Sequence, residues 1–189
     1  SVTGENVDME RLGGLDTHAR RSGVVHISAA NEADALSKGR VVTNLLAAQG
    51  GIGDVPDVDL GAILPESPKR AYDVHPVVEG LLDDDSMLEL HDRWAPNITT
   101  ALGRLGGRTV GVIANNPLRL GGCLDSLSAE KAARFVRMCD TFGVPLIVLV
   151  GGPRSVSFNP LALPPGGSRG TLGGARVCNK KTVMRVSRR

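Results

Sequence analysis

Apolar residues recur at helical spacing in two stretches of the chain. The first, Ala35–Gln49, follows Asn31, a good N-cap residue, and runs up to a pair of glycines that would stop a helix. The second, about Leu127–Phe142, is also followed by glycine, and either Ser126 or Ser128 is suited to cap its start. We therefore predict two amphipathic helices, separated by a long intervening segment.

Three further stretches have the apolar and β-branched content of strands. They are Met87–Trp94, Ile98–Leu105 and Thr109–Ala114. Gly106-Gly107 separates the last two, and a Gly-Gly pair readily adopts the positive φ that a tight hairpin turn needs. The pattern thus predicts a hairpin in the second half of the chain and one shorter strand near the N-terminus, at Val24–Ile27.

The strand nearest the C-terminal segment has a different pattern. Pro145–Val150 is a continuous apolar run, which is typical of a parallel strand covered on both faces. Strand, helix and strand in this order over Thr109–Val150 predict a βαβ unit with a right-handed crossover, and hence an α/β fold. Three apolar positions of its helix are expected to face the sheet: Phe135, Val136 and Cys139. Three basic positions are expected to face solvent: Lys131, Arg134 and Arg137.

Two changes of composition divide the chain. Residues 50–71 are rich in Gly, Pro and Asp and show no period, so we predict a linker between one unit at 1–49 and another at 72–150. Residues 151–189 contain eight Lys/Arg and no Asp or Glu, so the formal charge of +2 divides into −6 before Gly151 and +8 from there on. A basic tail rich in glycine is expected to be disordered.

The composition also limits the class of protein. With 189 residues the chain is long enough for one domain or for pieces of two, and with 3% aromatic residues its core must be aliphatic. No stretch approaches the roughly 18 apolar residues of a membrane span, so we expect no membrane association. Cys123, Cys139 and Cys178 are too far apart for a zinc site or a disulfide framework, so we expect reduced thiols and a cytoplasmic protein.

The loop before the second helix is the candidate site. Asn116, Gly121 and Gly122 are its candidate substrate-binding residues, because a glycine pair brings backbone N–H groups close to a ligand ahead of a helix N-terminus. The alternative is a tight loop without a ligand. The basic stripe of the helix is interpreted as a solvated face rather than a contact to nucleotide phosphates. We expect no metal, because the four histidines are scattered without ligand spacing. We identify no catalytic residue, because no nucleophile motif such as G-x-S-x-G is present.

Long blocks of the sequence resemble a known family. They are "VTGENVDMERLGGLDTHARRSGVVHI" (Val2–Ile27), "YDVHPVVEGLLDDDSMLELHDRWAPNI" (Tyr72–Ile98) and "GRTVGVIANNPLRLGGCLDSLSAEKAARFVRMCDTFGVPLIVLV" (Gly107–Val150). The family is that of the carboxyltransferase β subunits of biotin-dependent acyl-CoA carboxylases, with actinobacterial propionyl-CoA carboxylase β chains of lipid metabolism as the most similar type. The resemblance covers Ser1–Val150.

The resemblance implies fragments of two crotonase-like domains, with residues 1–49 ending the first and residues 72–150 opening the second. It implies transfer of CO₂ from carboxybiotin to acetyl-CoA or propionyl-CoA, without a metal in the transferase. The biotin is carried on a partner protein, and the family forms homo-oligomers of β subunits that work with a biotin-carboxylase/carrier α subunit. Two oxyanion sites stabilise the charge that develops during transfer, and both come from glycine-rich loops absent from these 189 residues.

The resemblance ends at the last predicted strand. There the family continues into a D-V-P-G-F/Y turn, whereas this chain reads Gly151-Gly152-Pro153-Arg154-Ser155. A shifted reading frame or a rearrangement would produce such a junction. We therefore expect a truncated carboxyltransferase homologue that is inactive by itself. The alternatives are a non-enzymatic pseudogene remnant or subunit-binding fragment, and a nucleic-acid binder, which is disfavoured because Phe158 is the tail's one aromatic residue.

Overall fold

The structure is a computed structural model that describes residues 8–55, 58–65, 67, 70–152 and 155–158. Its α-helices are α1 (Met9–Gly13), α2 (Leu15–Thr17), α3 (Glu32–Ala47), α4 (His75–Leu81) and α5 (Ser126–Phe142). Its strands are β1 (Leu88–Leu90), β2 (Ile98–Leu105), β3 (Arg108–Asn115), β4 (Leu146–Gly152) and β5 (Ser155–Phe158). A π-helical turn η1 (His18–Ser22) and two 3₁₀ turns, η2 (Leu60–Ile63) and η3 (Leu120–Gly122), complete the order.

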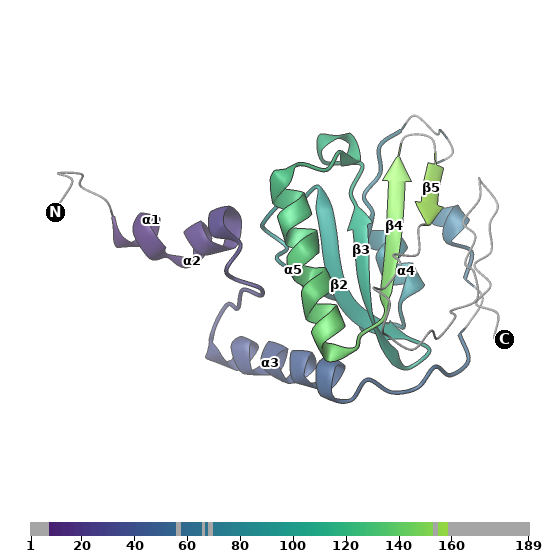
Figure 1. The fold of residues 1–189 in the computed structure, drawn as a ribbon, viewed down its shortest axis with the longest axis horizontal. Coiled ribbons are helices and arrows are strands. Elements are labelled where there is room, and N and C mark those ends of the chain that lie inside the picture. Colours follow the sequence, from purple (N-terminus) through teal and green to yellow (C-terminus); the bar gives the residue numbers. More distant parts are fainter. Residues whose placement is uncertain (1–7, 56–57, 66, 68–69, 153–154, 159–189) are drawn as a thin grey trace.

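The five strands form one mixed sheet in the order β1-β2-β3-β4-β5 (Figure 1). Only the β3–β4 pair is parallel among the described strands, with Val112 opposite Ile147. β3, α5 and β4 form the predicted βαβ unit. β2 and β3 form the predicted hairpin, which turns through Gly106 and Gly107 at φ angles of 57° and 82°. These positive angles explain why the turn uses two glycines.

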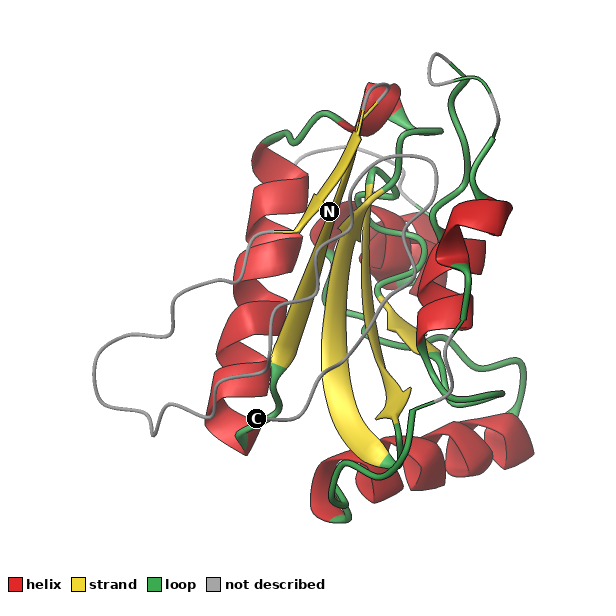
Figure 2. Ribbon diagram, turned by 90° about the vertical axis from the view of Figure 1, so that its right-hand side faces the viewer, coloured by secondary structure: helices red, strands yellow, loops and turns green. Residues whose placement is uncertain are grey.

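Helices cover both faces of the sheet, which therefore has the three layers of an α/β protein (Figure 2). α4 and η2 pack on one face, where Val78 and Leu60 join Val112 and Leu149 in an aliphatic core. α5 packs on the other face, where side chains from the end of α3 also contribute to the core. The described part of the chain contains no helix that is both long and apolar enough to cross a bilayer.

The apolar face of α5 is as predicted, but its basic face is not. Phe135 and Cys139 are buried against the sheet, and Val136 packs against the same cluster. Arg137 is exposed and Arg134 half-buried, whereas Lys131 is fully buried, which corrects the prediction that it faces solvent. The physical reason is that three backbone carbonyls meet its ammonium group, as described below. The N-cap is Asp125 rather than a serine, and Ser128 completes a capping box with it.

Three further predictions differ from the structure. No strand forms at Val24–Ile27. The strand expected at Met87–Trp94 shortens to β1, because the chain turns through positive φ at His91 and again at Ala95. β4 continues to Gly152 and pairs with β5, so regular structure extends into the first residues of the predicted tail. β3 pairs with one side of β4 only, and the backbone groups on the other side are free to pair with an adjacent extended segment such as β5. The remainder of the tail, 159–189, lies outside the described residues.

The segment predicted as a linker has little regular structure in the part that is described. Between residues 50 and 71, η2 is the one regular element among the described residues. The segment is nevertheless packed, since Leu60 is buried in the core and the Gly53 N–H donates to the Gly106 carbonyl at 2.7 Å. The described part of the segment thus contacts the β2–β3 turn and contributes to the core.

Candidate functional site

The candidate site is the segment Asn116–Asp125, which we call the glycine loop. It leaves the carboxyl end of β3, contains η3 and leads into α5. The carboxyl end of β4 lies beside it, because β3 and β4 are parallel neighbours. In open α/β sheets ligands bind at this edge, beyond the carboxyl ends of the strands. The loop therefore occupies the position where the fold favours a ligand.

Asn115 joins the glycine loop to the end of β4. Its side-chain Nδ2 donates to the carbonyl of Gly122 at 2.9 Å and to that of Gly151 at 2.5 Å. The Gly151 N–H in turn donates to Asn115 Oδ1 at 2.5 Å. One amide side chain therefore ties together the last residue of β3, the loop and the end of β4.

The two candidate glycines have different surroundings. Both are in the left-handed region, at φ 62° for Gly121 and 77° for Gly122. A Cβ on Gly122 would lie 2.5 Å from the Nδ2 of Asn115, whereas a Cβ on Gly121 would meet no atom within 4 Å. Gly122 is therefore needed for the contact with Asn115. Gly121 is exposed and leaves its backbone open to solvent.

Asn116 is buried and its side chain is occupied at both ends. Nδ2 donates to Asp73 Oδ1 at 2.9 Å, and Oδ1 accepts from the Leu118 N–H at 3.0 Å. The Asn116 N–H donates to the Asn97 carbonyl at 2.9 Å. The structure thus brings all three candidate residues into one loop, and Asn116 shapes that loop rather than presenting its amide group outward.

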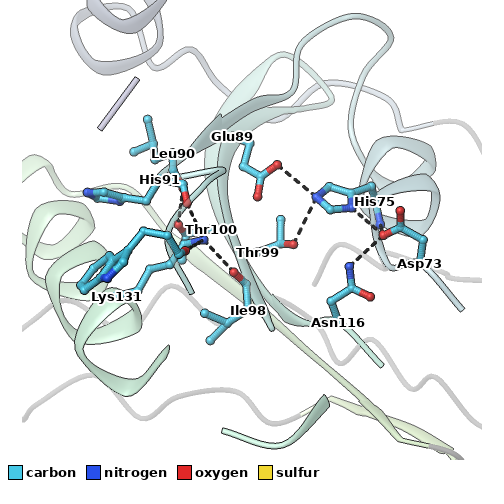
Figure 3. Close-up of polar contacts among 11 residues, drawn as sticks. Asp73, His75, Glu89, Leu90, His91, Ile98, Thr99, Thr100, Asn116 and Lys131 are labelled. Carbon is cyan, nitrogen blue, oxygen red and sulfur yellow. Dashed lines mark hydrogen bonds and ion pairs between the residues drawn. The ribbon is translucent and has the colours of Figure 1, made fainter. Parts of the chain in front are cut away.

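A charged cluster lies next to Asn116 and contacts it through Asp73 (Figure 3). His75, at the start of α4, bonds through Nδ1 to Asp73 Oδ1 at 2.5 Å and through Nε2 to Glu89 Oε2 at 3.0 Å. The hydrogen bond to Glu89 raises the pKa of His75 to about 9; partial burial opposes this shift and Asp73 adds to it. Burial pushes the pKa of Asp73 upward, but hydrogen bonds from His75 and Asn116 outweigh it and hold this pKa below its usual value. At neutral pH His75 is therefore an imidazolium and Asp73 a carboxylate.

The far end of the glycine loop is held by Asn97. Its Nδ2 donates to the Cys123 carbonyl at 2.9 Å and to Asp125 Oδ1 at 3.3 Å. Asn97 belongs to the turn between β1 and β2, and the buried Lys131 fixes that turn: its Nζ donates to the carbonyls of His91, Trp94 and Ile98. Burial lowers the pKa of Lys131 to about 8, with nearby carboxylates opposing the shift. The ammonium group thus remains protonated at neutral pH.

The comparisons with known proteins identify the family. The model of the family described as "Carboxyl transferase domain" matches residues 1–153. The chain belongs to the carboxyl transferase domain family. It is 56% identical over 158 residues to the biotin-dependent acetyl-/propionyl-coenzyme A carboxylase beta6 subunit of Mycobacterium tuberculosis. It is 55% identical over 161 residues to the propionyl-CoA carboxylase beta chain of Rhodococcus erythropolis. Each alignment covers 81% of this chain and 33% and 34% of the relative, so the chain spans about a third of their length.

Solved structures support the same fold. The transcarboxylase 12S, solved as a hexamer with methylmalonyl-coenzyme A and methylmalonic acid bound, matches with a TM-score of 0.72 and 34% identity. The match covers 78% of this chain and 30% of that one. A single-chain, multi-domain long-chain acyl-CoA carboxylase matches with a TM-score of 0.67 and 34% identity over 74% of this chain and 14% of that one. The carboxyl transferase domain described here is therefore α/β and crotonase-like, as expected.

The site of this carboxyl transferase domain offers backbone groups rather than an acid or base. Besides Asp125, a helix cap, the loop's titratable side chains are Arg119 and Cys123, both at its exposed surface. Four leucines in the loop and at the start of α5 are exposed: Leu118, Leu120, Leu124 and Leu127. The described residues contain no group of three or more His, Cys, Asp or Glu placed to hold a metal ion. The exposed backbone of Gly121, in a loop with exposed apolar side chains, is suited to contact a ligand.

Sequence reasoning missed the residues that support the loop. Asp73, His75 and Glu89 come from the start of α4 and from β1, and Asn97 from a turn. Nothing in their spacing links them to the loop, because the sheet pairing brings them together. The one local signal was the polar pair Asp73 and His75 at the start of the helix α4. This pattern indicates a functional cluster no more strongly than it indicates an ordinary helix start.

Proposed function

We propose that this chain is part of a carboxyltransferase β subunit of acyl-CoA carboxylase, and that the whole protein transfers CO₂ from carboxybiotin to acetyl-CoA or propionyl-CoA. The observation that carries the proposal is the identity of 56% with an acetyl-/propionyl-coenzyme A carboxylase subunit over 81% of this chain. The match to a transcarboxylase with methylmalonyl-coenzyme A bound supports the substrate class. The position of the glycine loop at the carboxyl edge of β3 and β4 is consistent with a substrate contact there.

The proposal assigns a part to each candidate residue. Gly121 presents its backbone to the substrate or to the biotin ring, while Asn116 and Gly122 hold the loop in the conformation that exposes it. Acyl-CoA is a substrate, and biotin arrives on a partner protein. The β subunits form a homo-oligomer in the cytoplasm together with a biotin-carrying subunit. Residues 1–49 close one crotonase-like domain, residues 50–71 link it to the next, and residues 72–150 open the second.

We predict that the 189-residue polypeptide by itself does not carboxylate acyl-CoA. Removing a proton from the α-carbon places negative charge on the thioester oxygen, and losing CO₂ from carboxybiotin places it on the ureido oxygen. Each charge needs preorganised N–H donors, and one such donor is worth about 3–4 kcal/mol of barrier. The two glycine-rich loops that the resemblance implies for this purpose are not among these residues.

The test is formation of malonyl-CoA or methylmalonyl-CoA by the purified chain with a carboxylated biotin partner. The beta chain from Rhodococcus erythropolis, given the same partner and acyl-CoA, is the positive control. Product above the no-protein control would refute the predicted inactivity. If the chain forms no product but still competes with the control enzyme for acyl-CoA or carboxybiotin, the result would support a binding role without turnover.

The alternative function is a non-enzymatic chain that binds β subunits. One observation favours it: the N-terminal helices extend away from the sheet, and Met9, Leu12 and Leu15 on them are exposed (Figure 1). Exposed apolar side chains in one segment are typical of a protein interface. Size-exclusion chromatography of the chain mixed with the Rhodococcus beta chain tests it. A shift to a mixed oligomer supports the alternative, and separate elution contradicts it.

A further inference from the structure

A cluster of three charged side chains lies outside the glycine loop but is connected to it. Asp73, His75 and Glu89, which we call the His75 cluster, come from the residues before α4, from α4 itself and from β1. The proposed carboxyl transfer gives none of them a part. Their side chains are partly accessible, with 45%, 32% and 21% exposed, so the cluster is a structural feature at the surface rather than a core ion pair.

The cluster is the first part of a continuous series of contacts that ends in the loop (Figure 3). Glu89 bonds to His75, His75 to Asp73, and Asp73 to Asn116. Asn116 then accepts the N–H of Leu118, the first contact inside the turn that leads to Gly121. Asp73 Oδ1 also accepts the backbone N–H of His75 at 3.2 Å. One carboxylate oxygen therefore fixes both the start of α4 and the side chain that shapes the loop.

The charge of the imidazole is needed for this arrangement. A neutral histidine donates from one ring nitrogen only, so it can serve only one of the two carboxylates. The other nitrogen would then direct a lone pair at a carboxylate oxygen. The charged groups that face the ring are Asp73 and Glu89, and β2 adds the uncharged hydroxyl of Thr99, whose Oγ1 lies 3.4 Å from Nε2. Protonated His75 is the species that matches these neighbours.

We propose that Asp73 and His75 are positioning residues for the glycine loop: bridged to Glu89, they hold Asn116 in the orientation that exposes the Gly121 backbone. The proposal rests on the proposed function only in taking the loop as the substrate contact. The coupling between cluster and loop is a property of the free chain, and its test uses no acyl-CoA or biotin. Failure of carboxyl transfer would leave that test unaffected.

The first test is amide hydrogen exchange by NMR on the 189-residue chain at pH 7. D73A is expected to accelerate exchange of the Leu118 amide at least tenfold relative to that of Val112 in the core strand β3. N116A is expected to do the same. The double variant should show no further acceleration, because both substitutions break one series of contacts. D140A, which removes an exposed carboxylate from α5, is the matched control and should leave the ratio unchanged.

Two outcomes would overturn the proposal. In one, D73A accelerates exchange of Leu118 and Val112 equally, which is what general destabilisation would produce. In the other, the effects of D73A and N116A add, which means that they act separately. Should D73A fail to fold, E89Q keeps the size of the side chain and carries the same comparison, with a smaller expected acceleration of about threefold.

The second test uses pH. A group whose pKa is raised on folding stabilises the fold fully below its unfolded pKa and loses this contribution as pH rises through the folded value. For His75 that window runs from its ordinary 6.5 to about 9. The ¹³Cγ shifts of Asp73 and Asn116 are expected to change together with a midpoint near pH 9. H75R, which stays charged, should keep Leu118 protected and remove the transition, whereas H75Q should lose both.

The pH series also has an outcome that contradicts the proposal. If the imidazole of His75 titrates while the ¹³Cγ shift of Asn116 stays constant from pH 7 to 10, then the charge of the cluster does not reach the loop. Equal protection of Leu118 in H75R and H75Q would likewise show that the bridge is dispensable. The carbon shifts are suitable for this range because they do not depend on exchangeable protons.

Discussion

Replacing Lys131 by methionine is expected to lower the free energy of unfolding by about 3–5 kcal/mol. The Lys131 side chain is fully buried, and its Nζ lies 2.8–2.9 Å from three backbone carbonyls, those of His91, Trp94 and Ile98. Methionine fills the space of the stem but donates no hydrogen bond. Each buried acceptor left unpaired costs about 1–3 kcal/mol. The loss for His91 is at the lower end, because its carbonyl also accepts the Trp94 N–H.

Denaturant unfolding, followed by the fluorescence of the single tryptophan, measures this effect. Trp94 is a suitable reporter because it is buried in the same turn. K38M is the matched control: Lys38 also donates to a backbone carbonyl, that of Ser28, and to Asp34, but its side chain is 38% exposed. Exposed pairs contribute about 1 kcal/mol or less, so K38M should have a small effect. Equal losses for the two variants would contradict the assigned importance of the buried ammonium.

The βαβ unit and the hairpin could be predicted because their signals are local. Gly106-Gly107 marks a turn by itself, and the period of α5 places Phe135 and Cys139 on one side whatever the helix packs against. β5 could not be predicted in the same way. Its four residues form a strand because the edge of β4 is next to them, and an edge is a property of the assembled sheet.

The burial of Lys131 shows where helical periodicity fails. The period assigns each position of α5 to a face, and on that basis a basic residue in a charged stripe belongs in solvent. Helical periodicity gives no information about the three backbone carbonyls, from a turn 33 to 40 residues earlier, that surround the Lys131 ammonium group in place of water. The same turn supplies Asn97, which holds the glycine loop. A side chain that was expected to face solvent thus supports the candidate site.

The candidate site was predicted in outline, but the roles within it were not. A glycine pair ahead of a helix indicates a loop that exposes its backbone, and Gly121 has this property. The sequence does not distinguish Gly121 from Gly122, because both are glycine. Their backbone conformations do not distinguish them either, since both are left-handed. Their difference lies in Asn115, whose amide group touches one and not the other. The sequence also proposed Asn116 as a substrate-binding residue, whereas the structure shows its amide group engaged by Asp73 and by the Leu118 N–H.

This difference between the glycines leads to a paired prediction. G121A is expected to destabilise the chain by about 1 kcal/mol, because an alanine at positive φ carries a strain of about 1–2 kcal/mol, partly offset by lower entropy of the unfolded chain. G122A carries the same two contributions. In addition its methyl group would lie 2.5 Å from Asn115 Nδ2 and 3.4 Å from the Gly151 carbonyl. Asn115 must then move and give up its hydrogen bonds to Gly122 and Gly151.

Each of those hydrogen bonds contributes about 1 kcal/mol, so G122A is expected to destabilise the chain by about 3 kcal/mol. The backbone contributions are common to both variants, and the difference of about 2 kcal/mol isolates what Asn115 does. Denaturant midpoints followed by Trp94 fluorescence give the two values. N115A should lower stability by about 2 kcal/mol, and on that background G122A should add only about 1 kcal/mol, the backbone strain that G121A also carries, since the hydrogen bonds of Asn115 are already lost. Equal destabilisation by the two glycine variants would mean that the tie between the loop and the end of β4 contributes nothing, and that the loop keeps its shape through Asp73, Asn97 and Asn116 alone.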